Sequence, residues 1–208
     1  MSSISGHNAH KNYARRQPNQ EQLYLIGESH GGYFTAAEGA SAGYSRSLLA
    51  HHADAGMLDR VSHGVYRLRR YPESPHADLI VAWLRAGPMS AISHESALSL
   101  YGLSDVLPTE VHLTVPRSAS RRRAGLRLHT GKLNEDEVVQ IEGMRVTTTE
   151  RTIADVARSG LAQELVEQAI REALGRGLTT RRRLLDLGDA RGGRAKRIIE
   201  TALEQGRE

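Results

Sequence analysis

The chain has 208 residues, of which 39% are hydrophobic and 25% are charged, so it can carry one or two domains with real apolar cores. Its formal net charge is +4 at pH 7, a mild positive excess that is consistent with an anionic partner. It has no cysteine, which excludes disulfides and thiolate zinc sites. No segment approaches ~18 consecutive apolar residues and no signal peptide is recognisable, so we expect a soluble, cytoplasmic protein with no membrane contact.

The beginning of the chain is polar, and we expect residues 1–18 to be a disordered basic arm. Lys11, Arg15 and Arg16 would let this arm lie along a DNA backbone or enter a minor groove. A floppy terminus without a role is the alternative.

A first helix is predicted from Gln20 to Glu28, because Asn19 stands in front of it as a typical N-cap residue. We expect Leu23, Leu25 and Ile26 to face inward and to cover the back of the helices that follow.

Two short helices and a tight turn are predicted next. Thr35 and Glu38 have the spacing of a capping box, so a helix begins there. Gly39 and then the run 41–43 indicate that it ends soon. Ser45 caps a second helix, with Leu49 facing inward and a short, small and basic face at its start. This is the layout of a helix-turn-helix.

A basic β-hairpin follows, with strands predicted at 57–61 and 65–68 around the turn 62–64. It completes a winged helix-turn-helix domain over residues 19–71. Arg46 is long enough to bond guanine O6 and N7 in the major groove, and the other polar groups suit phosphates or base edges. The residues predicted to contact DNA are Thr35, Ser45, Arg46, Ser47, His51, Arg60, Ser62, His63, Arg67, Arg69 and Arg70. The alternative is a non-catalytic module whose winged helix docks a protein and whose arginines form only a solvated face.

Paired prolines indicate a linker at 72–76, and a second domain is predicted over residues 77–208. Its patterns favour a mixed α/β domain with a small antiparallel sheet, followed by a helical C-terminus, so the fold class is α+β. A capping box at Thr147 and Glu150 begins the helical part, and glycines near 175–177 and 188–193 separate its later helices.

Two arginine clusters stand out in the second domain. Arg121, Arg122 and Arg123 are predicted on the loop of a hairpin, where they would clamp phosphates and extend a DNA footprint. Arg181, Arg182 and Arg183 open a helix at the positive end of its dipole, which an anionic partner or an antitoxin role would explain. For both clusters the alternative is a solvated charge run.

We expect no catalytic residues, no cofactor and no metal. The neighbours Ser93, His94 and Glu95 point in different directions on a helix and do not form a triad, so Ser93 is interpreted as a helix cap. His112 and His129 are predicted on adjacent strands, but without a placed carboxylate they make a poor metal site.

Four segments, taken together and in order, resemble the AbiEi antitoxins of type IV toxin–antitoxin systems. They are Gly56–Leu68, Ser93–Leu103, Val111–Pro116 and Val146–Asp155. The resemblance implies an N-terminal winged helix that represses its own operon. Because one winged helix covers about one half-site, we expect the protein to bind an inverted repeat in its own promoter as a possible dimer on DNA. The resemblance also implies a second domain that counters a nucleotidyltransferase-like toxin without a stable complex.

Overall fold

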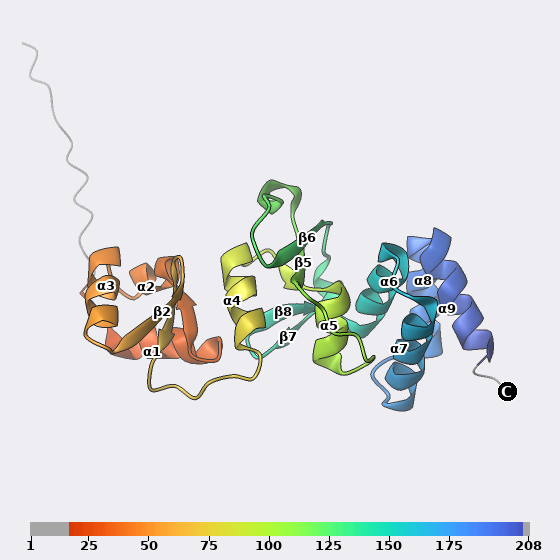
Figure 1. Cartoon of the computed structure of the whole chain (residues 1–208), viewed down its shortest axis with the longest axis horizontal. Coiled ribbons are helices and arrows are strands. Elements are labelled where there is room, and N and C mark those ends of the chain that lie inside the picture. Colours follow the sequence, from red (N-terminus) through yellow and green to blue (C-terminus); the bar gives the residue numbers. More distant parts are fainter. Residues whose placement is uncertain (1–16, 206–208) are drawn as a thin grey trace, which may run out of the picture.

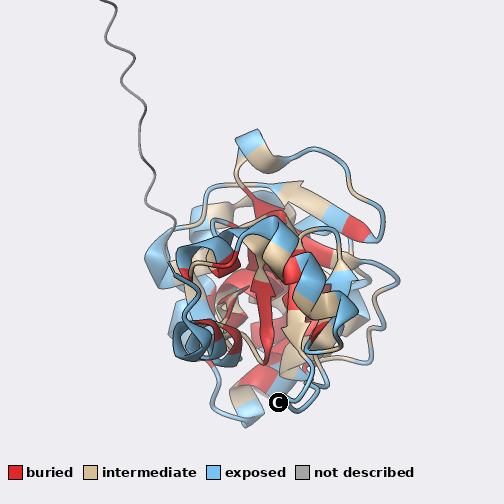
Figure 2. Cartoon of the chain, turned by 90° about the vertical axis from the view of Figure 1, so that its left-hand side faces the viewer, coloured by how far each residue is buried: buried red, intermediate tan, exposed pale blue. Residues whose placement is uncertain are grey.

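The structure, a computed structural model, describes residues 17–205 (Figure 1). The basic arm predicted over residues 1–18 therefore lies almost wholly outside the described residues. Within the described part the molecule is elongated: a small N-terminal unit, a central sheet and a C-terminal helical bundle follow one another along its long axis. Seen end-on, buried residues fill the middle of the molecule and exposed residues surround them (Figure 2). The α+β fold class is confirmed.

The N-terminal unit combines three helices with a three-stranded antiparallel sheet in the order β1-β3-β2. Its elements are α1 (Gln20–Ser29), β1 (Tyr33–Thr35), α2 (Ala36–Ser41), α3 (Arg46–Asp54), β2 (Leu58–Ser62) and β3 (Val65–Leu68). The predicted helices and hairpin are all present. Strand β1 was not predicted, because three residues carry almost no pattern and the strand exists only through pairing with β3.

The apolar core of this unit is small and lies between the helices and one face of the sheet. It consists of Leu23, Phe34, Ala42, Tyr44, Leu49, Leu58 and Tyr66. The expectation for Leu25 is wrong: its side chain is 55% exposed, because α1 turns Leu23 and Gly27 inward at helical spacing. Gly39 does not end α2 but lies buried inside it, where the absence of a side chain lets Leu49 of α3 approach closely.

The second unit contains a five-stranded sheet in the order β6-β5-β4-β8-β7. Its elements are α4 (Ala77–Ala86), β4 (Ala91–Ile92), α5 (His94–Tyr101), β5 (Val111–Val115), β6 (Leu126–Thr130), β7 (Val138–Ile141), β8 (Met144–Thr147), α6 (Thr149–Ser159), α7 (Gln163–Gly175), α8 (Arg181–Arg191) and α9 (Gly193–Gln205).

This sheet is mixed rather than antiparallel throughout. Strands β5 and β6 pair in parallel, from Val111 opposite Leu126 to Val115 opposite Thr130, and β4 pairs in parallel with β8. The loop 116–125 is therefore a crossover and not the predicted hairpin. In sequence both strands alternate between apolar and polar residues, as expected. This alternation is the same for parallel and antiparallel strands, so it does not indicate the direction of pairing.

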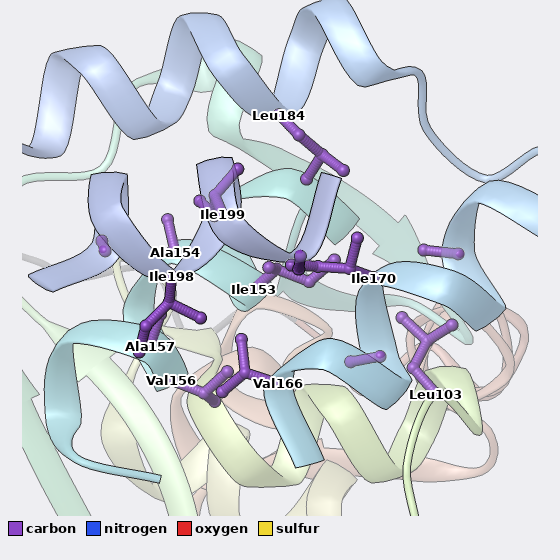
Figure 3. Packing of buried hydrophobic residues seen from close by; sticks show 14 of the residues in the cluster. Leu103, Ile153, Ala154, Val156, Ala157, Val166, Ile170, Leu184, Ile198 and Ile199 are labelled. Carbon is purple, nitrogen blue, oxygen red and sulfur yellow. The ribbon is translucent and has the colours of Figure 1, made fainter. Parts of the chain in front are cut away.

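Helices α6 to α9 form the C-terminal bundle around a core that includes Ile153, Ile170 and Leu184 (Figure 3). Helix α6 is capped by Thr148, whose side chain accepts from the backbone N–H of Arg151. The predicted capping box of Thr147 with Glu150 is therefore not formed: the helix begins one residue later, and the residue three positions after its cap is an arginine. The predicted break at Gly188 is absent, because this glycine is buried in α8 where it packs against α9.

The two units share a packed boundary. Tyr33 and Val65, on the outer face of the small sheet, belong to the same apolar cluster as Ile80 and Trp83 of α4. The His30 ring meets the Trp83 ring edge-on, with 5.2 Å between their centroids. The small sheet thus faces α3 on one side and the second unit on the other.

Candidate nucleic-acid interface

Helix α3 is the element best placed to enter a groove of DNA. The Ser45 hydroxyl accepts a hydrogen bond from the backbone N–H of Leu48 at 3.2 Å, which begins the helix, and Leu49 is fully buried against α2. The opposite side of the first turns is consequently outside, and Arg46, Ser47 and His51 are all exposed. The exposed start of α3 thus carries one guanidinium, hydroxyls and an imidazole, which are groups that bond base edges and phosphates.

Thr35 does not belong to this exposed face. Its hydroxyl donates to Glu38 at 2.8 Å, and its backbone N–H donates to the same carboxylate at 2.7 Å. The predicted capping box is therefore formed, and Thr35 holds the start of α2. A contact between this hydroxyl and DNA stays a prediction.

The hairpin β2–β3 forms the predicted wing. Gly64 turns it with a φ of +73°, a left-handed conformation that favours glycine. Arg60 and His63 are exposed on it, and Ser62 is half-buried beside an irregularity in the strand pairing. Arg60 and His63 are thus the wing residues that can meet a phosphate backbone.

Arg67 is held inside the protein. Its guanidinium pairs with Asp59 at 3.2 Å, donates to the carbonyl of Tyr71 at 2.8 Å, and is only 15% exposed. It lies opposite Tyr33 on the sheet face that packs toward α4, away from the face that supports α3. The structure therefore does not bring Arg67 together with the exposed residues of α3.

The arginines that follow β3 are more open. Arg69 is 58% exposed, although its side chain lies 3.5 Å from Asp59 and donates to the carbonyl of Gly56 at 3.2 Å. Arg70 is exposed. Both are exposed beside the wing, and the contacts with the DNA backbone predicted for them stay predictions.

The two arginine clusters of the second unit differ in their surroundings. Arg121 and Arg122 are exposed on the crossover loop, which stands out from the sheet in Figure 1, and Arg123 is half-buried. At the start of α8, Arg182 lies 3.9 Å from Asp186 and Arg183 lies 3.7 Å from Glu150. The second cluster is thus partly balanced by its own carboxylates. The roles predicted for both clusters stay predictions.

A histidine cluster, which the sequence interpretation missed, lies at the edge of the five-stranded sheet. His94 stacks on His129 with 3.5 Å between ring centroids, and the His112 ring lies 5.2 Å from that of His129. His94 adopts a φ of +52°, which is uncommon for a residue with a side chain. The three residues are far apart in sequence, and only the adjacent-strand placement of His112 and His129 pointed toward them.

Ser93 serves this cluster and is not a side-chain cap of α5. Its hydroxyl accepts from the Thr114 hydroxyl at 2.9 Å and lies 2.9 Å from Nδ1 of His94. Burial, with the neighbouring imidazoles, lowers the pKa of His94 to about 2. Burial is also the main cause that lowers the pKa of His112 and of His129 to about 4. All three imidazoles are therefore neutral at pH 7.

A buried ion network adjoins the histidines. Arg151 is paired with Asp155 at 2.7 Å and with Glu137 at 3.0 Å, and Glu137 is also paired with Arg191. Burial raises the pKa of Asp155, partly offset by Arg151. For Glu137 the effect of burial is outweighed by the amide of Asn134 and by the two guanidiniums, which lower its pKa. Residues 17–205 contain no group of histidines and carboxylates arranged to hold a metal ion.

Residues 21–69 match a protein family described as a transcriptional regulator, the AbiEi antitoxin. The match covers the N-terminal unit, from α1 to the end of the wing. It confirms the resemblance inferred from the sequence and supports a regulatory role for this unit. No curated protein matches the chain.

The chain is similar in fold to the RV2827C protein from Mycobacterium tuberculosis. The TM-score is 0.53 at 13% sequence identity, and the alignment covers 92% of this chain and 78% of that one. At this identity the likeness concerns the fold alone, and it extends over both units. None of the helices between residues 17 and 205 has the length and apolarity needed to span a bilayer.

Proposed function

We propose that this chain, whose residues 21–69 match the AbiEi antitoxin family of transcriptional regulators, is a sequence-specific repressor that binds double-stranded DNA at its own promoter. The observation that carries the proposal is the exposed start of α3, where Arg46, Ser47 and His51 face outward. The other side of this helix is fixed by Leu49, which is fully buried. A rigid helix with such a face is how this class of domain reads the major groove. Arg60 and His63 of the wing would hold the flanking phosphates.

The expected target is an inverted repeat. One winged helix covers about one half-site, so two copies should bind together even if the free protein is monomeric. The function is non-catalytic and needs no cofactor, and it places the protein in the cytoplasm with the DNA.

Arg46 is the residue that tests this assignment. Arg46→Ala should lower affinity for the promoter by about 1 to 3 kcal/mol and affinity for random DNA much less, because a base contact is lost rather than a phosphate contact. Arg197→Ala is the matched control, since Arg197 is an exposed helix arginine at the other end of the molecule. Gel shifts on promoter and scrambled duplexes measure both. An unchanged preference for the promoter in Arg46→Ala would remove α3 as the reader.

A second part of the proposal is antitoxin activity against a nucleotidyltransferase-like toxin, without a stable complex. It follows from the family of the N-terminal unit and concerns the second unit. Cells that express a toxin encoded beside this chain should be rescued by the full chain and equally by Arg46→Ala. Failure of the full chain to rescue growth would contradict antitoxin activity. It would not bear on DNA binding, which the gel shifts test separately.

The alternative is a non-catalytic interaction module whose winged helix docks a protein. It predicts that retention on DNA is weak, independent of sequence and unaffected by Arg46→Ala. The exposed Tyr24 and Leu25 on α1, 49% and 55% exposed, are the observation that favours such docking.

A further inference from the structure

A polar cavity of about 450 Å³ opens between the edge of the five-stranded sheet and the helical bundle. Its walls come from the ends of β5 and β6, the segment that follows β6, the start of α5, helix α6 and the end of α8. This volume falls in the range of small-molecule sites. The elements that line the cavity lie away from α3 in Figure 1, so the cavity has no part in the proposed reading of DNA.

The charge of the cavity walls is positive. Four cationic side chains and one carboxylate line it, namely Lys132, Arg151, Arg158, Arg191 and Asp155. Glu137 balances part of this charge, because it pairs with both Arg151 and Arg191. Lys132 and Arg158 are exposed at the rim, and no ion pair between either of them and a described carboxylate is present. A positive excess therefore remains for a ligand.

Several polar groups in the walls have no partner among the described residues. Nε of Arg191, a donor, and Nε2 of His129, a donor or an acceptor according to the tautomer, are both buried and unbonded. Arg151 uses Nε and Nη1 for Asp155, Glu137 and the Lys132 carbonyl, which leaves Nη2 without a protein partner in residues 17–205 and able to donate into the cavity. Leaving a buried donor such as Arg191 Nε unbonded costs free energy, so the walls favour an occupant that accepts hydrogen bonds.

His94 adds a donor whose direction is fixed by its neighbours. Thr114 donates to the Ser93 hydroxyl, so within residues 17–205 Nδ1 of His94 is the acceptor that the Ser93 proton can reach, and we assign the proton to that contact. The proton of the neutral His94 ring then resides on Nε2, which makes that nitrogen a donor. The ring is 8% exposed and lines the cavity, held there at the unusual φ of +52°. Strained residues of this kind concentrate at ligand sites.

We propose that this cavity binds a small molecule that carries a phosphate or diphosphate group. Lys132 and Arg158 would attract and pair with the anion at the rim, and His94 Nε2 and Arg151 Nη2 would donate to its oxygens. A dianionic tetrahedral group matches walls in which cations and donors outnumber the one lining carboxylate, Asp155, which is itself paired with Arg151. The cavity exceeds the size of a lone phosphate, so the remainder of the molecule also fits.

The rim cations allow a test that leaves the core intact. Isothermal titration of the full chain at pH 7 and constant ionic strength should detect binding of pyrophosphate and of ADP. The double substitution Lys132→Gln with Arg158→Gln should weaken this binding at least about tenfold, because each removes a charge-assisted contact. The control is Arg171→Gln with Arg197→Gln, which removes the same charge from exposed positions on α7 and α9 and should change affinity less than about twofold.

A second measurement does not depend on variants. Long-range ¹H–¹⁵N spectra should show the His94 and His129 ring nitrogens shifting when pyrophosphate is added, while the exposed His51 and His63 stay unchanged. Tighter binding of ADP than of pyrophosphate would extend recognition to the nucleoside, and equal binding would confine it to the phosphates; both support the proposal.

Four results would overturn it. The first three are no binding of either probe up to about 10 mM, equal losses of affinity in the two double variants, and shifts in the exposed histidines only. The fourth is displacement of pyrophosphate by a random DNA duplex, because the cavity would then bind the DNA backbone.

Discussion

At the scale of single residues, the arginines of the N-terminal unit divide into those that face outward and those that hold the fold. Arg46 and Arg60 are exposed, whereas Arg67 is tied to Asp59 and to the Tyr71 carbonyl. In sequence these residues look alike, since each is a cation on a short amphipathic element. Only the register of β1 with β3, which sets Arg67 opposite Tyr33, places it on the inner side.

Arg67→Ala should therefore act on stability. The change removes the ion pair that Arg67 forms with Asp59 and the hydrogen bond that it donates to the Tyr71 carbonyl. We therefore expect the free energy of unfolding to fall by about 1 to 3 kcal/mol. Arg60→Ala, in the neighbouring strand, is the control and should change it by less than about 0.5 kcal/mol. Urea unfolding followed by circular dichroism measures both. Equal stability of the two variants would contradict the structural role of Arg67.

The neutral histidines give a prediction about pH. In the unfolded chain they titrate near pH 6.5, whereas in the folded chain the pKa of His94 is lowered to about 2 and those of His112 and His129 to about 4. At a pH between the folded and unfolded pKa values, the unfolded chain binds more protons than the folded chain does. The free energy of unfolding therefore decreases as the pH falls below 6.5. Each histidine contributes at most about 1.4 kcal/mol per pH unit.

Thermal unfolding between pH 7 and pH 5 checks this, a window above the range in which ordinary carboxylates titrate. The melting temperature should fall steeply, and His129→Gln should flatten that fall whatever its effect at pH 7. His63→Gln, on the exposed wing, should leave the slope unchanged. A wild-type melting temperature that stays constant over this window would contradict neutral burial of the cluster.

At the scale of elements, the sequence predicted most where the signal is local. The caps at Asn19, Thr35 and Ser45 were all identified correctly, because a side chain that bonds an amide three residues away needs nothing else from the fold. The parallel pairing of β5 with β6 was missed, as was the histidine cluster. Both features depend on which segments, distant in sequence, come into contact in the fold. The alternation of apolar and polar residues within a strand carries no information about such contacts.

Gly39 tests the packing of α2 on α3. A Cβ at this position would lie 3.1 Å from Leu49 Cδ1, so Gly39→Val should push the helices apart. We expect a loss of stability of about 1 to 3 kcal/mol and weaker promoter binding. Gly175→Val is the control, because Gly175 lies in α7 with open space around its Cα, and it should be close to neutral. Wild-type melting and promoter affinity in Gly39→Val would show that α3 is not seated on α2 as described.

At the scale of the whole molecule, the winged helix is docked on the second unit rather than merely tethered to it. The predicted linker 72–76 is itself part of the boundary, since Ser74 and His76 both bond Glu142, at 2.7 and 2.9 Å. Beside Glu142, Gly143 lies so close to α1 that a Cβ would come within 1.8 Å of the Ser29 carbonyl oxygen. The prolines of the linker predicted a boundary between two units, but nothing in the sequence predicted this contact between them.

Gly143→Ala should loosen that boundary, because an atom cannot occupy the space of a backbone carbonyl. We expect trypsin to cleave after the exposed Arg70 several-fold faster than in the wild type, with a lower melting temperature. Gly160→Ala is a matched control: both glycines have a positive φ, +77° and +100°, but Gly160 has open space beside it. Equal effects of the two substitutions would mean that backbone strain, and not the boundary, is responsible.

The central claim is that the N-terminal unit binds DNA through α3 and a basic wing, and its salt dependence tests this most directly. Fluorescence anisotropy of the full chain on its promoter duplex gives the dissociation constant as a function of salt concentration. If about 4 to 8 phosphates are neutralised per bound unit, the log-log slope of the association constant is roughly −4 to −7. A slope near zero, or equal affinity for promoter and random duplexes at every salt concentration, would contradict the claim.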